Sequence, residues 1–132
     1  MARATADIGT VNYATALVAG HHPLTSDEGS ALGGKDTGAA PHELLCAALA
    51  ACTAITLRMY AERKSWPLRA AHVDVLFRHE GESRTMTRRL QLEGELDEAQ
   101  RARLADIAER TPVTLTLKLG VAITTILEPR AA

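Results

Sequence analysis

The sequence predicts an α+β fold in which two helices lie on one side of a mainly antiparallel sheet. Three observations support this. A long apolar helical stretch starts at Pro41, two alternating strands flank a tight turn at residues 80–83, and an amphipathic helix starts after Asp97. The predicted order is strands, helix, hairpin, helix, strand, which suits an α+β architecture. One domain is expected to cover residues 1–132.

The first 20 residues predict one or two short strands. Residues 13–18 place β-branched side chains in partial alternation, and Gly20 follows them. The stretch from His21 to Ala40 is polar and contains four glycines, so it predicts a long loop with one short strand around Ser30 to Leu32. Long loops of this kind often carry function.

The segment from Pro41 predicts a long helix that ends near Ser65, before Pro67. Proline suits the first helical turn, and the acidic Glu43 lies near the positive end of the helix dipole. The run from Leu44 to Leu57 is apolar on all sides, which predicts a buried, surrounded helix. A small chain has few elements to cover such a helix, so a second subunit is expected to supply part of the cover.

The second half of the chain predicts a hairpin, a helix and a last strand. Residues 73–79 and 86–92 alternate in character around the turn at residues 80–83. Asp97 is expected to cap the second helix, with Gln100 three residues on, and an apolar stripe at helical spacing follows. Pro112 marks a break, after which the β-branched residues from Gly120 to Leu127 predict a final strand.

Charge and composition exclude several partners. The formal net charge is -1, and aromatic residues make up only 3% of the chain, so neither a broad electrostatic field nor stacking platforms favour nucleic acid. No apolar stretch of signal-peptide length opens the sequence, and the uncharged apolar run from Leu44 to Leu57 is too short to span a bilayer. We therefore expect a cytoplasmic protein with no nucleic-acid and no membrane partner.

The chain has two cysteines, Cys46 and Cys52. On a helix, a separation of six residues turns them by about 240° and places them roughly 9 Å apart along the axis. This exceeds the limit of about 7 Å between the Cα atoms of a disulfide. Their spacing also fits no common metal site, so no metal and no cofactor are expected. From the residues alone, each cysteine is either an inert core residue or a nucleophile.

Four further residues are candidates for a site around such a nucleophile. His42 and Glu43 begin the predicted helix, and His21 and His22 lie in the preceding loop. Any of them could act on a nearby thiol. The alternative is that they only cap the helix or lie solvated in the loop.

The segment from Gly33 to Leu68 carries a family resemblance. A glycine-rich loop leads into Pro-His-Glu-Leu-Leu at 41–45, and Ala-Ala-Leu-Ala-Ala-Cys follows at 47–52. This pattern resembles the central segment of the OsmC/Ohr family, in which P-x-E-L-L or P-E-E-L precedes A-A-x-x-A-C. The predicted hairpin, amphipathic helix and final strand also follow the family's order. The resemblance implies an OsmC-like fold and an intertwined homodimer.

The resemblance implies that Cys52, eleven residues after Pro41, is the peroxidatic cysteine. The family enzymes reduce peroxides with that thiolate, assisted by an arginine from the N-terminal region and a glutamate just after the proline. Here His42 directly follows the proline and Glu43 comes next, while the only arginine before the helix is Arg3.

The family's second cysteine, in a C-P motif after the amphipathic helix, resolves the sulfenic acid as a disulfide. Thr111-Pro112 stands at that position in this chain. The chain is therefore more similar to an OsmC-like branch with a P-Y-E-L-L form than to the two-cysteine peroxidases.

Two functions follow from this resemblance. In the first, the protein is a one-cysteine thiol peroxidase for organic hydroperoxides, in which Cys52 attacks, Glu43 or His42 orients the site, and His21 or His22 binds the substrate in place of the arginine. An external thiol must then reduce the sulfenic acid. In the alternative, the protein is not an enzyme, and a pocket between the subunits binds a small apolar ligand or serves structure alone.

Overall fold

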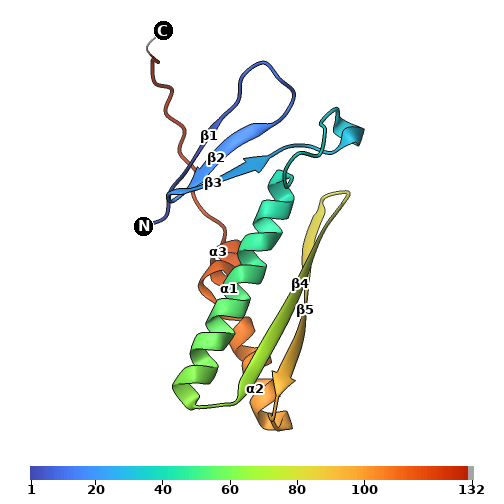
Figure 1. Ribbon diagram of the computed structural model, residues 1–132, viewed down its shortest axis with the longest axis vertical. Coiled ribbons are helices and arrows are strands. Elements are labelled where there is room, and N and C mark those ends of the chain that lie inside the picture. The colour runs from blue at the N-terminus through green and yellow to red at the C-terminus, as the bar shows by residue number, and fades with distance from the viewer. Residues whose placement is uncertain (131–132) are drawn as a thin grey trace. The chain divides into compact units, whose positions relative to one another are not determined.

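The computed structural model describes residues 1–130 (Figure 1). Its elements are β1 (Ala4–Asp7), β2 (Thr15–Ala19), β3 (His22–Ser26), the 3-10 turn η1 (Ser30–Leu32), α1 (Pro41–Lys64), β4 (Leu68–Glu80), β5 (Ser83–Gly94), α2 (Glu98–Ala108) and α3 (Pro112–Leu119). The α+β class is confirmed. Two compact units divide the chain: one holds residues 1–51 and 73–89, and the other holds residues 52–72 and the chain from residue 90 onward.

The first unit contains an antiparallel sheet in the order β1-β2-β3 (Figure 1). The prediction of one or two short strands in the first 20 residues is confirmed, since β1 and β2 both lie there, but the third strand, β3, was predicted as loop. Gly20 has a φ of 63°, so the chain turns tightly there and brings His22 opposite Ala19. The polar β3 then gains the hydrogen bonds of a sheet edge, where its Pro23 is tolerated. The pairing of β3 with β2 therefore makes a strand of a segment whose own residues have little preference for one.

The strand predicted around Ser30 to Leu32 is wrong, because these residues form a 3-10 turn. Gly33 ends that turn with a φ of 90°, a conformation that glycine adopts without strain. The loop then returns against β3, where a Cβ added at Gly38 would overlap the carbonyl oxygen of Thr25. The glycines therefore serve a tightly folded loop that leads into α1.

The long helix and the hairpin form as predicted. The helix α1 ends at Lys64, and Ser65 then takes a positive φ of 56°. The strands β4 and β5 are longer than the predicted 73–79 and 86–92, and Gly81 with a φ of 59° allows the tight turn between them. Both strands contribute residues to both units.

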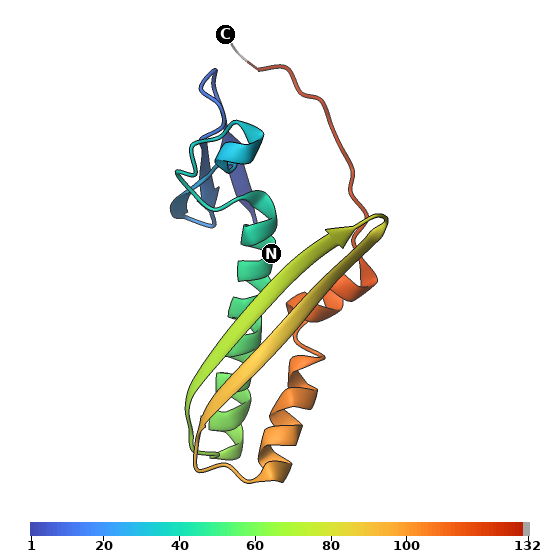
Figure 2. The same cartoon turned by 90° about the vertical axis from the view of Figure 1, so that its right-hand side faces the viewer.

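The core of the second unit lies between α1, α2 and the base of the hairpin. Leu57 and Ala61 of α1 pack with Leu68 of β4 and Leu104 of α2, and all four side chains are buried. Figure 2 shows α2 beside the C-terminal half of α1. The predicted cap is confirmed, since the Asp97 carboxylate accepts from the Gln100 N–H at 2.8 Å.

The predicted last strand is wrong. Residues 112–119 form α3, and residues 120–130 have no regular secondary structure. Four apolar side chains in this tail are 65–97% exposed: Val121, Ile123, Ile126 and Leu127. A β-rich sequence becomes a strand only when another strand supplies its hydrogen bonds, and none pairs with this segment within residues 1–130.

The helix α1 is covered on one side only by its own chain. Leu49 and Leu57 are buried, whereas Leu45, Ile55 and Met59 are 38%, 55% and 57% exposed. The prediction of a surrounded helix is thus wrong for one chain. The whole of α1 also has the length and apolar composition of a membrane span, with a mean hydropathy of 1.7 over 18 residues, a test that the core helices of soluble proteins also pass.

Candidate active site

The thiol of Cys52 is half-buried in the middle of α1. Its Sγ lies 4.0 Å from Oγ1 of Thr56, one turn further along the helix. The neighbouring Thr53 is fully buried and faces the interior of the second unit. Cys52 therefore sits at the border between the buried and the exposed sides of the helix, within reach of a hydroxyl group.

An exposed apolar stripe runs along α1 past this thiol. Leu45, Ile55 and Met59 form this stripe, and the helical period of about 100° per residue places them within roughly 60° of Cys52 around the axis. Their exposure leaves hydrophobic surface uncovered on both sides of the sulfur. Such surface is typical of a site that takes up an apolar molecule or another chain.

Cys46 occupies a different side of the same helix. Both cysteines are free thiols, and α1 is unbroken between them. The helical geometry assumed for the sequence is therefore confirmed, and it keeps the two sulfurs from forming a disulfide while α1 is folded.

Glu43 and His42 lie at the start of α1, and each has a partner there or on the hairpin. Oε1 of Glu43 accepts a hydrogen bond from the N–H of Ala40 at 2.9 Å, which is one half of a capping box. The His42 ring stacks on Phe77 of β4, with ring centres 4.5 Å apart and an interplanar angle of 13°. Both residues precede Cys52 by nine or ten positions, or about 13–15 Å of helix rise.

His21 and His22 lie at the turn between β2 and β3. Both side chains are exposed, and their ring centres are 4.1 Å apart. The structure brings the rings of the two histidines together. Their role in substrate binding stays a prediction.

A buried carboxylate organises the loop before α1. Asp27 is 2% exposed and accepts hydrogen bonds from the N–H groups of Tyr13, Glu28, Lys35 and Thr37. The hydroxyl of Thr37 donates a further bond of 2.6 Å. This hydroxyl, followed by the backbone donors, holds the pKa of Asp27 far below its usual range, so the carboxylate stays ionised.

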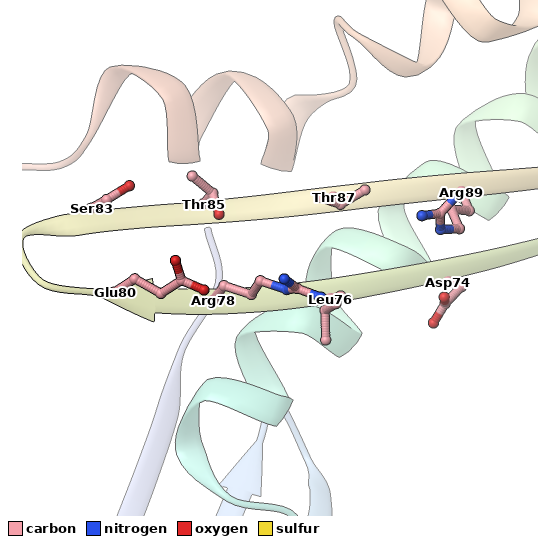
Figure 3. A pocket seen from close by; sticks show the side chains of 8 residues that line it. All are labelled: Asp74, Leu76, Arg78, Glu80, Ser83, Thr85, Thr87 and Arg89. Atoms are coloured by element: carbon pink, nitrogen blue, oxygen red, sulfur yellow. The ribbon is translucent and has the colours of Figure 1, made fainter.

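Two hollows lie in the first unit. One, of about 400 Å³, lies beside Asp27 and is lined by Tyr13, Leu32 and Pro41 among others. The other, of about 480 Å³, covers one face of the hairpin, where alternate residues from Asp74 to Glu80 and from Ser83 to Arg89 point to the same side (Figure 3). Cys52 lines neither hollow.

Within residues 1–130, no group of three His, Cys, Asp or Glu side chains is placed to hold a metal ion.

Comparisons with known proteins identify the family. The family described as OsmC-like protein matches residues 34–126. The chain belongs to the OsmC-like family. A comparison with curated protein sequences finds no match.

Solved structures of OsmC-like proteins share the fold. An OsmC-like protein from Mycoplasma pneumoniae has a TM-score of 0.77 at 16% identity, over 89% of this chain and 87% of that one. The organic hydroperoxide resistance protein OsmC from Legionella pneumophila has a TM-score of 0.64 at 21% sequence identity, over 89% of each chain. A third structure, from Vibrio cholerae, is described as a putative organic hydroperoxide resistance protein with captopril bound in one of its active sites. It has a TM-score of 0.67 at 20% sequence identity, over 89% of this chain and 84% of that one.

In this OsmC-like chain, Thr111 occupies the place where the sequence resemblance puts a second cysteine. The residue is fully buried, and it is the N-cap of α3. Its Oγ1 accepts from the N–H of Thr114 at 3.3 Å. The position therefore has a structural role here, and it carries no sulfur.

Thr56 was not predicted from the sequence as a neighbour of the Cys52 thiol, nor Asp27 as the carboxylate that organises the loop before α1. Thr56 could have been found, because a residue four positions after Cys52 lies on the same side of a helix. Asp27 gave no such signal, since its five hydrogen bonds come from Tyr13 before β2 and from the loop after β3, and the sequence does not show that these segments meet.

Proposed function

We propose that this OsmC-like protein is a one-cysteine thiol peroxidase that reduces organic hydroperoxides through Cys52. The observation that carries the proposal is the position of Cys52: a partly exposed thiol, within reach of a hydroxyl, on the apolar stripe of α1. A fully packed thiol with no polar neighbour would have favoured a structural role. The descriptions of related structures as organic hydroperoxide resistance proteins also support it.

The proposed reaction needs an external thiol. The Cys52 thiolate attacks the outer oxygen of the hydroperoxide, the O–O bond breaks, and the alcohol leaves after taking up a proton, so that Cys52 becomes a sulfenic acid. An external thiol then condenses with it to a mixed disulfide and releases water. A second external thiol displaces Cys52, leaving the external disulfide and the reduced enzyme.

We further propose that the protein acts as a homodimer. The apolar stripe of Leu45, Ile55 and Met59 and the unpaired tail both expose hydrophobic side chains. Covering such surface with a second copy removes it from water and surrounds the thiol with apolar groups. An alkyl hydroperoxide is a suitable substrate for that environment.

Peroxide turnover with a panel of external reductants tests the function. The protein should consume cumene hydroperoxide when a dithiol such as dithiothreitol or dihydrolipoamide is supplied, and Cys52→Ser should abolish this consumption. Cys46→Ser is the matched control and should retain it. If no reductant supports turnover and peroxide leaves Cys52 unmodified, the proposal is wrong, and the non-catalytic, ligand-binding alternative replaces it.

A further inference from the structure

The hydroxyl of Thr56 faces the proposed nucleophile from one helical turn away. The distance from Oγ1 to the Cys52 Sγ is 4.0 Å, at the long end of hydrogen bonds to sulfur. Both side chains are half-buried and belong to the same continuous helix, so helix geometry places the two residues on the same side of α1, one turn apart. A rotation of the Thr56 hydroxyl hydrogen is enough to aim a donor at the sulfur.

The backbone offers this thiol no comparable donor. Cys52 is the twelfth residue of the 24-residue α1, far beyond the first turn in which helical N–H groups are free. The favourable field of the helix dipole for an anion also fades beyond the first turn. A thiolate at this position must therefore be stabilised by side chains.

Two of the candidates from the sequence have other partners. Glu43 is acidic and caps the helix start through the Ala40 N–H, and His42 stacks on Phe77. A carboxylate would in any case repel a thiolate, since the two charges have the same sign. Thr56 is a neutral donor, and its hydroxyl lies within hydrogen-bond reach of the sulfur.

We propose that Thr56 is a catalytic residue of the Cys52 site, whose hydroxyl donates a hydrogen bond to the thiolate. In the neutral thiol state, the Thr56 hydroxyl can instead donate to a main-chain carbonyl one turn earlier, as threonines in helices commonly do. When Cys52 loses its proton, the hydroxyl turns to the sulfur, and no backbone movement is needed. This assignment rests on the proposed function, because the Cys52 thiolate is the attacking group in that function.

The test measures alkylation of Cys52 without any peroxide, in the full-length Cys46→Ser protein. Thr56→Val keeps the side-chain shape but removes the donor. We expect iodoacetamide to react with its Cys52 about tenfold more slowly at pH 7, while the two rates converge at high pH, where the thiol is ionised in both proteins. Thr56→Ser restores the hydroxyl and should restore the rate at pH 7.

Two controls separate this effect from a general loss of structure. Thr53→Val removes the adjacent threonine hydroxyl, which faces the interior, and should leave the alkylation profile of Cys52 in place even if it lowers Tm. Thr56→Ala provides a second variant in case valine disturbs folding, and it should slow alkylation in the same way.

The outcomes distinguish this inference from the function on which it rests. An unchanged alkylation rate in Thr56→Val and Thr56→Ala at pH 7 overturns it, as does a Thr56→Ser protein that is as slow as Thr56→Val. A slowed rate that serine restores supports it even if no peroxide is consumed, in which case only the proposed peroxidase activity fails.

Discussion

The hydroxyl oxygens of Thr111 and Thr114 lie 2.6 Å apart, and both side chains are buried. Oγ1 of Thr114 in turn donates to the carbonyl oxygen of Ala108 at 3.2 Å. A short chain of hydrogen bonds therefore joins the end of α2 to the start of α3. In two-cysteine relatives the resemblance places a thiol at this junction, whereas here the junction holds the two helices together.

Thr111→Cys tests whether a resolving thiol can be restored. After one equivalent of hydroperoxide, we expect a disulfide between the new cysteine and Cys52, detected by non-reducing peptide mapping in the Cys46→Ser background. Loss of the cap should cost about 1 kcal/mol of stability. Thr111→Ser keeps the hydroxyl and should form only sulfenic acid. If Cys52 is oxidised in Thr111→Cys without a disulfide, the junction does not have the expected geometry.

Cys52 should react faster than Cys46 with iodoacetamide at neutral pH. Both thiols are half-buried, but Cys52 borders the exposed apolar stripe and has the Thr56 hydroxyl within reach. The single variants Cys46→Ser and Cys52→Ser separate the two rates by intact mass. Faster labelling in Cys52→Ser than in Cys46→Ser would assign the reactive position to Cys46 and refute the site.

Sedimentation should report a homodimer at micromolar concentration, with about twice the 14.1 kDa mass of the chain. Ile55→Lys places a charge on the apolar stripe of α1 and should shift the protein toward monomer, because burying an unpaired charge is costly. Leu76→Lys is the matched control, since Leu76 is 48% exposed and its neighbour Phe77, which points to the other face of β4, is the residue that stacks on His42 of α1. A wild-type monomer would contradict the prediction.

Asp27→Asn should lower Tm by several degrees at pH 7, because the amide cannot accept all five hydrogen bonds as well as the carboxylate. The folded pKa of Asp27 lies below the unfolded value of about 3.9. Its stabilising contribution is therefore complete above about pH 4 and is lost as the pH falls further. The difference in Tm between wild type and Asp27→Asn should accordingly shrink below pH 4, and a constant difference would argue against this role.

The sequence predicted the elements whose signals are local. The helix from Pro41, the hairpin around Gly81 and the cap at Asp97 each depend on neighbouring residues, and all three are confirmed. The elements that failed depend on distant pairing: β3 forms because β2 lies beside it, and the predicted strand at Gly120 to Leu127 lacks such a neighbour.

The features of the candidate site also fall into those that local sequence predicts and those that depend on distant contacts. The position of Cys52 followed from a local motif, and so did the helical separation that keeps Cys46 away from it. The stacking of His42 on Phe77 could not be predicted, because the two residues are 35 positions apart and meet only when the hairpin folds. The same is true of Asp27, whose donors are spread from Tyr13 to Thr37.

The tail after α3 has a consequence for handling the protein. Residues 121–127 contain no charge and no proline, and they are rich in β-branched side chains, the composition of segments that stack into cross-β aggregates. Wherever this segment is uncovered, chains at high concentration can associate through it irreversibly. If the proposed homodimer covers this segment, dilution should release it and be followed by slow precipitation on reconcentration, and Ile123→Lys should prevent that precipitation.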